Sequence, residues 1–316
     1  MYQNTDIAAS NFVKGVDTAF VIIFAVALFF LVSITATMIY FVFRYNKKRN
    51  PKATQIEGSV ILEVLWTVIP IIIVMGLFYV GWAGWNPMKK VPKDAFTITA
   101  EARMWQFSFI YPNGKREKEL IVPQGKAIRL NLKSLDVIHS LYIPSFRVKE
   151  DLVPGSLKHM WFIPQKVGNY DIFCAEYCGL DHSHMLSTVK VLPDSAFQSW
   201  YIDTTQVAQA STAKTPAQAG HELMEQTGCF ACHTVDGSKL VGPSYKGIWG
   251  ETVLVKTANG KKEVTVDAEY IKRSIYDPNA EIVDGFNSGL MLSYKDQLKE
   301  EDIELIVEYL KTLSHN

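Results

Sequence analysis

The chain has 316 residues, of which 48% are hydrophobic and 20% charged, which excludes a wholly disordered protein. Its length favours about two domains. Lys plus Arg and Asp plus Glu both number 32, so no basic excess indicates nucleic-acid binding. Four cysteines are too few for a disulfide scaffold in a chain of this length.

Two long apolar runs lie near the N-terminus. Residues 18–43 and 64–85 contain no charged side chain. Each run exceeds the ~20 residues that a helix needs to cross the hydrocarbon core of a membrane. We therefore predict a transmembrane hairpin over residues 1–90, with spans at about 18–43 and 62–85. Only Lys14 is basic before the first run, so we expect a retained span and not a cleaved leader.

The loop between the two runs is strongly basic. Its cations are Arg44, Lys47, Lys48, Arg49 and Lys52. Short basic loops stay on the cytoplasmic side of a membrane. We therefore expect both termini, and everything after about residue 90, on the opposite side. In a bacterium this is the periplasmic or outer side of the plasma membrane.

Residues 91–201 carry the pattern of a β-domain. Residues 98–111 are rich in aromatic and β-branched side chains, and residues 127–134 alternate between apolar and polar. Turn signals such as those at 112–114 and 153–155 separate these runs. Short strands at this spacing predict a β-sandwich or barrel.

Candidate metal ligands gather in the segment CAEYCGLDHSHM and in the upstream segment DVIHS. They offer thiolate, imidazole or thioether donors: His139, Cys174, Cys178, His182 and Met185. A mononuclear blue-copper site uses two His, one Cys and a weak axial Met. This set has one thiolate more, so two bridging thiolates with one His on each metal would hold two copper ions.

Other uses of these residues remain open on sequence grounds. Cys174 and Cys178 could form a disulfide. Two Cys and two His could hold a structural zinc ion. His159 and His184 are further candidate imidazole ligands.

A second site is predicted in the C-terminal part. Residues 202–215 are small and polar and predict a linker. Within residues 216–316, the motif Cys229-x-x-Cys232-His233 is the attachment site of a c-type haem. A thioredoxin-type redox pair is the alternative, but it would not need the histidine.

The second axial ligand of this haem follows from the remaining donors. Met224 is only five residues before Cys229, so it cannot easily reach the far face of the haem. Met291 can, and we favour it. His221 and His315 are the imidazole alternatives. Met/His ligation would give a comparatively high reduction potential.

Residues 1–201 resemble subunit II of haem–copper cytochrome c oxidases. The motifs that match are LEVLWTVIP (62–70), MWQFSFIY, DVIHS and CAEYCGLDHSHM, in this order. The resemblance implies a cupredoxin-like Greek-key β-sandwich that holds a binuclear copper centre, CuA. The CuA ligands of the family fall on His139, Cys174, Cys178, His182, Met185 and the backbone carbonyl of Glu176.

The same resemblance assigns roles to three further side chains. The Glu176 carboxylate would ligate a magnesium ion shared with subunit I. Glu63 falls on the family's proton-uptake carboxylate, and Trp105 on the tryptophan that receives electrons. The family often has a second tryptophan two positions after the first, where this chain has Phe107.

Residues 216–314 resemble a small, all-α class I cytochrome c. The segment VGPSYKGIWG matches the turn of that family in which the carbonyl of Pro243 would accept the N–H of His233. The chain departs from many relatives at Met291-Leu292, where they have Met-Pro. The C-terminal segment 300–313 has apolar residues at helical spacing and predicts a core helix.

The order of the parts along the chain, which is membrane hairpin, CuA domain, linker and cytochrome c domain, resembles the fused subunit II of caa(3)-type oxidases. It implies that electrons enter at haem c, pass to CuA and continue to haem in subunit I, where O₂ is reduced and protons are pumped. The implied partners are subunit I, subunit III, and cytochrome c or a quinol–cytochrome c reductase as electron donor. The alternatives are the equivalent subunit of a CuA-containing nitric oxide reductase, and a non-enzymatic electron carrier or copper-handling protein.

Overall fold

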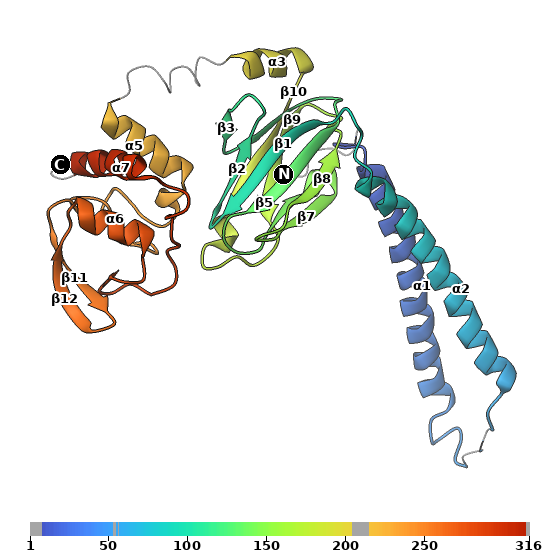
Figure 1. The fold of residues 1–316 in the computed structure, drawn as a ribbon. Helices are drawn as coiled ribbons and strands as arrows, with labels where there is room; N and C mark the ends of the chain where they lie inside the picture. The colour runs from blue at the N-terminus through green and yellow to red at the C-terminus, as the bar shows by residue number, and fades with distance from the viewer. Residues whose placement is uncertain (1–7, 53–54, 56, 204–214, 314–316) are drawn as a thin grey trace.

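The computed structural model describes residues 8–52, 55, 57–203 and 215–313. Figure 1 shows three parts in a row: a long helical hairpin, a β-sandwich, and a smaller domain that is mainly helical. The sandwich lies between the other two. Most of the segment predicted as a linker lies outside the described residues, so the linker stays a prediction.

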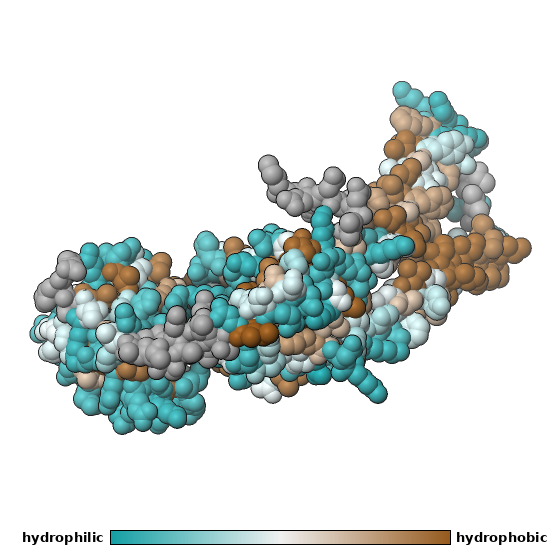
Figure 2. Space-filling view, turned by 90° about the horizontal axis from the view of Figure 1, so that it is seen from above, coloured by the Kyte–Doolittle hydropathy of each residue, from teal (hydrophilic) through white to brown (hydrophobic). Residues whose placement is uncertain are grey.

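The hairpin consists of α1 (Val13–Arg44) and α2 (Val60–Trp85), and the 3₁₀ turn η1 (Asn86–Lys89) follows α2. Both helices are long and apolar enough to cross a membrane. Neither of these fully described helices buries a side chain within the chain. Figure 2 shows the hydrophobic residues gathered on the hairpin, while the other two parts are mostly hydrophilic. The two predicted spans are confirmed.

Specific contacts fix the sandwich to the end of the hairpin. Arg147 Nε donates to Asp17 Oδ1 of α1 at 2.7 Å. Trp161 Nε1 donates to the carbonyl of Pro87 at 3.2 Å, and the ring of Phe12 packs edge-to-face on Trp161. The sandwich therefore has a defined attachment to the membrane-spanning helices.

The sandwich is built from two five-stranded sheets. The strands of the first, in spatial order, are β3 (Arg116–Glu117), β2 (Gln106–Ile110), β1 (Phe96–Arg103), β5 (Ile128–Ser134) and β8 (Lys158–Phe162). Those of the second are β4 (Leu120–Pro123), β10 (Leu186–Leu192), β9 (Gly168–Cys174), β6 (His139–Ile143) and β7 (Val148–Leu152).

Alternating apolar side chains explain why these sheets pack face to face. In β5, Ile128, Leu130 and Leu132 are fully buried, while the residues between them are not. A period of two places these side chains on one face of the sheet. The sandwich also carries η2 (Pro144–Phe146) and η3 (His182–His184), and α3 (Asp194–Ile202) follows β10. The cupredoxin-like fold expected for this part is confirmed.

The strand-rich segment 98–111 is divided by a turn. β1 pairs antiparallel with β2, and Arg103 lies opposite Gln106. Met104 and Trp105 therefore form the tip of a tight hairpin. This places Trp105 at an end of the sheet, close to the loop that follows β9.

The C-terminal domain packs its first and last helices together. Its helices are α5 (Pro216–Gln226), α6 (Ala268–Tyr276) and α7 (Glu300–Thr312), with the 3₁₀ turn η4 (Cys229–Ala231) after α5. A Cβ atom on Gly220 would lie 1.9 Å from the carbonyl oxygen of Leu305. Only glycine therefore permits the close approach of α5 to α7. The predicted C-terminal helix is confirmed, with Ile303, Ile306, Val307 and Leu310 buried.

An all-α domain was expected here, but the structure shows that this domain is not entirely helical. It contains a three-stranded sheet in which β11 (Thr252–Thr257) lies between β12 (Gly260–Thr265) and β13 (Ile282–Val283). The hairpin segment is rich in Val and Thr, and it turns at Ala258 and Asn259, directly before Gly260, the first residue of β12. Two strand-like runs joined by a two-residue turn favour a β-hairpin. This local pattern prevails over the all-α expectation.

Candidate metal centre and haem pocket

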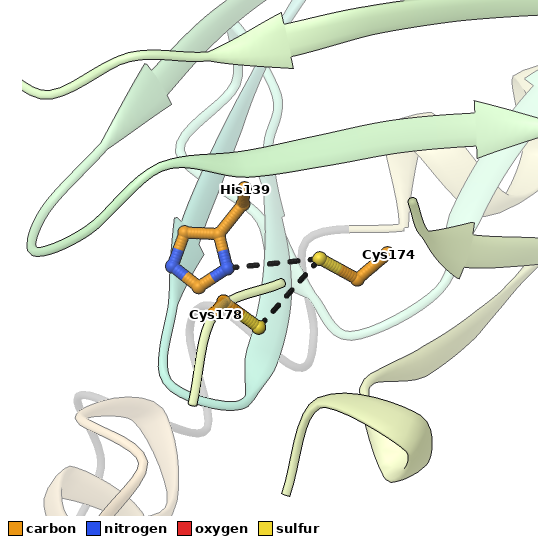
Figure 3. A group of neighbouring side chains, drawn as sticks. All are labelled: His139, Cys174 and Cys178. Atoms are coloured by element: carbon orange, nitrogen blue, oxygen red, sulfur yellow. Dashed lines mark hydrogen bonds between the residues drawn. The ribbon is translucent and has the colours of Figure 1, made fainter. Parts of the chain in front are cut away.

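The predicted copper ligands come from two neighbouring strands and the loop between β9 and β10. His139 begins β6 and Cys174 ends β9. Cys178, His182 and Met185 lie in the loop that follows Cys174. Because β6 and β9 pair antiparallel, the start of one strand lies beside the end of the other. Figure 3 shows the resulting convergence of His139, Cys174 and Cys178.

The donor atoms form a continuous chain of short separations. Cys174 Sγ lies 3.7 Å from Cys178 Sγ and 3.9 Å from His139 Nδ1. Cys178 Sγ lies 3.4 Å from His182 Nδ1 and 3.8 Å from Met185 Sδ. Cys174 Sγ also contacts the carbonyl oxygen of Glu176 at 3.3 Å. All six predicted ligand groups therefore meet at one place.

This arrangement fits two soft metal ions better than the alternatives. A disulfide requires an S–S distance of about 2.05 Å, and both cysteines are free here. A structural zinc ion would take all four Cys and His donors around one centre. Instead, each imidazole lies beside a different sulfur, with the two sulfurs between them. Thiolate and thioether donors favour copper over hard cations.

A buried carboxylate orients the first imidazole. His139 Nε2 lies 2.7 Å from Asp136 Oδ1, and both side chains are fully buried. Burial raises the pKa of Asp136, but the hydrogen bond and charge of His139 and the backbone N–H groups of Met104 and Val137 together lower it below its ordinary value, so the carboxylate is ionised. This partner places the proton of His139 on Nε2 and leaves Nδ1 as the lone-pair nitrogen that faces the sulfurs.

The pKa values of the two thiols are shifted in opposite directions. Burial raises the pKa of Cys174, but hydrogen bonds with His139, the backbone of Ser140 and Glu176, and Cys178 together lower it to about 6. Burial and the neighbouring Cys174 thiolate raise the pKa of Cys178. Both must be deprotonated to ligate a metal, so binding of a metal ion here would release any proton that these thiols still carry.

The second predicted site is a large apolar cavity. It has an empty volume of about 1420 Å³, including the part that is open to solvent. Cys229, Cys232, His233 and Met291 all line it, together with Tyr245 and Tyr294. Both cysteines are free. The cavity therefore presents the two attachment thiols and both predicted axial ligands to one space, as a covalently bound haem requires.

The proximal histidine is held in its ligating form. His233 Nδ1 lies 2.7 Å from the carbonyl oxygen of Pro243, so Nδ1 carries the proton and Nε2 the lone pair. Burial lowers the pKa of His233, which keeps the ring neutral. Tyr245 stacks on the ring with a centroid separation of 4.6 Å. A Cβ atom on Gly242 would lie 2.4 Å from the ring, so glycine is required there.

The structure separates the candidates for the second axial ligand. Met291 and Met224 line the cavity, whereas His221 is not among its lining residues. The ring of His221 instead packs between Phe230 and Tyr309. His315 lies outside the described residues. Met291 remains the predicted ligand.

Comparisons with known families agree with this division of the chain. Residues 1–80 match the model "Cytochrome C oxidase subunit II, transmembrane domain", and residues 113–192 match "Cytochrome C oxidase subunit II, periplasmic domain". These two matches together span about half of the chain. The chain belongs to the cytochrome c oxidase subunit II family. Residues 217–314 match the cytochrome c family, so this subunit II carries a fused cytochrome c domain.

Two relatives that cover most of the chain support the same assignment. Cytochrome c oxidase subunit 2 of Alkalihalophilus pseudofirmus is 28% identical over 300 residues, which cover 90% of this chain and 83% of the relative. The Bacillus subtilis protein of the same name is 29% identical and covers 87% and 81%. The solved periplasmic domain of subunit II from Bradyrhizobium japonicum is 32% identical over 39% of this chain and all of that chain, with a TM-score of 0.35. The protein is thus a membrane-bound oxidoreductase subunit with two spans.

Trp105 lies directly against the copper-ligand loop of this subunit II. Its Nε1 donates to the carbonyl oxygen of Cys178 at 3.0 Å, and its side chain is buried. Phe107, which stands where the family often has a second tryptophan, is a core residue with 1% exposure. The position of Trp105 suits the predicted electron-receiving role, and Phe107 belongs to the packing of the sandwich.

Two other predicted residues lie apart from the redox sites or face outward. Glu63 is in the first turn of α2, at the end of the helix that is remote from the sandwich (Figure 1). Glu176 is exposed in the loop after β9. Of the additional histidines, His184 pairs with Asp181 at 2.6 Å and is largely exposed, and His159 is exposed on β8. None of these side chains joins the cluster of sulfur and imidazole donors.

Sequence reasoning missed two residues that serve the sites. Asp136, which holds His139, is only three residues away in the motif DVIHS, and an i,i+3 carboxylate is the signal that could have identified it. Arg103, which lies at the entrance of the β1–β2 turn, contacts the cytochrome domain. No local pattern marks this contact, since its partner is 124 positions away.

Proposed function

We propose that this chain is the electron-receiving subunit of a respiratory terminal oxidase. The observation that carries the proposal is the presence in one subunit II of two complete donor sets. One is the Cys174–Cys178 pair with its two imidazoles, and the other is the cavity that contains Cys229, Cys232 and His233. When bound, copper and haem c would each supply reversible one-electron chemistry.

The proposed direction of transfer is from haem c to binuclear CuA and then to haem in subunit I. There O₂ is reduced to water and protons are pumped. This chain needs a polytopic partner for that chemistry, because its two spans and seven histidines do not suffice for a haem–copper centre. Subunit I is the required partner, and subunit III is a further one.

Several finer roles belong to the same proposal. Glu63 is the proton-uptake carboxylate near the cytoplasmic side, and the exposed Glu176 carboxylate holds a magnesium ion shared with subunit I. Trp105 receives electrons for the copper centre. Both redox domains lie on the periplasmic or outer side of a bacterial plasma membrane, as the basic loop after α1 indicates. Cytochrome c or a quinol–cytochrome c reductase is the donor.

The copper assignment is tested by Cys178→Ser in the purified complex. We expect loss of the near-infrared absorption of CuA and failure of reduced haem c to become reoxidised. Met160→Leu is the matched control, because Met160 is a buried sulfur of the sandwich outside the ligand set. Normal turnover of the Cys178→Ser complex would refute the proposal. Consumption of NO and not of O₂ by the wild-type complex would instead support a nitric oxide reductase.

The role of Glu63 is tested separately by Glu63→Gln. We expect slower proton uptake during reduction of the complex, while reduction of the copper centre by haem c proceeds at the wild-type rate. Glu57→Gln is the control, because this carboxylate precedes α2 and lies outside the helix. Unchanged proton uptake in Glu63→Gln would assign Glu63 a structural role.

A further inference from the structure

The haem cavity of the cytochrome domain is closed partly by the sandwich. Besides residues of the cytochrome domain, Arg103, Met104 and Asp136 of the sandwich line it. Cys232 and Val241 of the cytochrome domain pack against the hydrophobic core cluster of the sandwich. The attachment motif therefore lies against the β1–β2 turn, and the two domains share a defined contact.

Arg103 makes the most specific contacts across this boundary. Its Nη1 donates to the carbonyl oxygen of Thr227 at 2.9 Å, and its Nη2 donates to Gln297 Oε1. Its guanidinium lies over the ring of Tyr294, 4.6 Å from the ring centroid. Tyr294 in turn donates to the carbonyl of Thr227 at 3.3 Å. One planar side chain thus holds two separate segments of the cytochrome domain.

The partners of Arg103 are placed to orient the haem-attachment loop. Thr227 is two residues before Cys229, and its side chain contacts Cys229 Sγ at 3.4 Å. A guanidinium presents its donors in a fixed fork, so it constrains the orientation as well as the distance of what it binds. On the other side of the turn, Trp105 donates to the carbonyl of Cys178, a copper ligand.

We infer that Arg103 is a positioning residue that docks the fused cytochrome domain on the sandwich, with the haem-attachment loop held against the β1–β2 turn. The inference rests on the proposed function, because it explains how the tethered donor is kept in one productive arrangement. Transfer from haem c to CuA then proceeds from a docked state and needs no diffusive search by the tethered domain.

A second charged contact between the domains is weaker. Lys118 Nζ lies 2.7 Å from Glu225 Oε1, but the two side chains are 53% and 46% exposed. Exposed ion pairs of this kind contribute little and are screened by salt. Lys118 therefore serves as a comparison for Arg103 at the same boundary.

The test compares Arg103→Ala, Arg103→Lys and Lys118→Ala in the purified complex. Arg116→Ala is the matched control, because Arg116 Nη1 pairs with Glu101 within the sandwich at 3.1 Å. The measurement is the rate at which flash-reduced haem c passes its electron to CuA, followed at increasing viscosity. The wild-type, Lys118→Ala and Arg116→Ala rates should not depend on viscosity.

For Arg103→Ala we expect a rate about tenfold lower, because two charge-assisted hydrogen bonds and a cation–π contact are lost together. The residual rate should fall as viscosity rises, since the domain must now find its docked position. Arg103→Lys keeps the charge but loses the planar fork, so it should be intermediate. Gln297→Ala removes the partner of Arg103 in the cytochrome domain. Combining it with Arg103→Ala should not lower the electron-transfer rate any further.

A second measurement does not depend on electron transfer. Hydrogen exchange of the backbone amides of residues 227–233 should accelerate in Arg103→Ala and remain unchanged in Arg116→Ala. A wild-type rate, independent of viscosity, with unchanged exchange in Arg103→Ala would overturn the inference. If the wild-type complex itself transfers no electron from haem c to CuA, the proposed function fails, and the exchange result still decides whether Arg103 docks the domain.

Discussion

At the scale of single residues, each redox site combines ligands with a partner that fixes the ligand's chemistry. His139 is held by the carboxylate of Asp136, and His233 by the carbonyl of Pro243. In both cases the partner selects the tautomer and leaves the other ring nitrogen free to bind a metal. Such partners are expected to matter nearly as much as the ligands themselves.

The role of Asp136 predicts the behaviour of Asp136→Asn. Replacing the buried carboxylate by an amide weakens the orientation of His139, so copper affinity should fall by about 10- to 100-fold. Copper retained by the purified complex during dialysis against a chelator measures this effect. Asp194→Asn, an exposed carboxylate at the start of α3, is the control. Equal retention in Asp136→Asn and wild type would contradict the assignment.

Met291 as second axial ligand predicts a lower reduction potential of haem c in Met291→Ala. Thioether ligation favours the reduced iron, and its loss removes that preference. A redox titration of the haem absorption gives the potential directly. Met224→Leu is the control, because Met224 also lines the cavity but lies on the helix that leads into the attachment motif. The assignment would be wrong if only the control shifted the potential.

Residue patterns predicted most of the ligands but not the residues that hold those ligands in place. The copper ligands could be identified because the side chains of four of them, two Cys, one His and one Met, fall within one short segment. The haem motif is also contiguous. Arg103 and Thr227 could not be paired in this way, because only the docking of two domains brings them together. A contact of this kind cannot be predicted from a local sequence pattern.

At the scale of elements, the cytochrome domain depends on the crossing of α5 and α7. A Cβ atom at Gly220 would meet the backbone of Leu305, which cannot yield as a flexible side chain can. Gly220→Ala should therefore destabilise the domain by about 1–3 kcal/mol or more, as overpacking does. Thermal unfolding followed by the haem absorption tests this, with the exposed Gln226→Ala as control. An unchanged midpoint in Gly220→Ala would contradict the packing described.

The β11–β12 hairpin braces the segment that leads to Met291. Asp284 pairs with Lys261 at 2.8 Å and Lys256 at 2.9 Å, and its backbone N–H donates to the carbonyl of Leu254. Hydrogen bonds from Lys261 and Lys256 lower the pKa of Asp284 to about 2. The sheet that the all-α expectation missed thus supports the loop that carries an axial ligand.

This brace predicts a defined dependence on pH. The pKa of Asp284 is lower in the folded chain than in the unfolded chain. The contribution of its ion pairs to the stability of the fold is therefore complete above the ordinary Asp pKa of about 3.9, and it is lost as the pH falls towards about 2. At neutral pH, Asp284→Asn should accelerate hydrogen exchange of the residue 284 amide. Asp296→Asn, at an exposed position, is the control. Equal exchange in wild type and Asp284→Asn would show that the ion pairs do not hold the loop.

At the scale of the whole molecule, different contacts join the sandwich to the helical hairpin and to the cytochrome domain. The sandwich is fixed to the helical hairpin by Asp17–Arg147 and by the contacts of Trp161. The cytochrome domain contacts the sandwich through Arg103 and its partners. Tethering raises the effective concentration of a donor, and docking adds orientation to it. The order of the parts places the haem pocket and the copper site on the same side of the hairpin.

The overall organisation could be predicted because each part has its own sequence signal. The apolar runs predicted α1 and α2, and alternating residues predicted strands such as β5. The turn at Met104 and Trp105 was not predicted, because the residues on both sides share one strand-like composition. Its position matters, since it brings Arg103 and Trp105 to the boundary between the two redox domains.

The most direct test of the central claim is a cofactor inventory of the purified complex. We predict one haem covalently bound to this polypeptide, visible by haem staining after denaturing electrophoresis, and two copper ions that are lost from the complex in Cys178→Ser. A wild-type polypeptide without covalent haem, or a Cys178→Ser complex with the same copper content as wild type, would contradict the account.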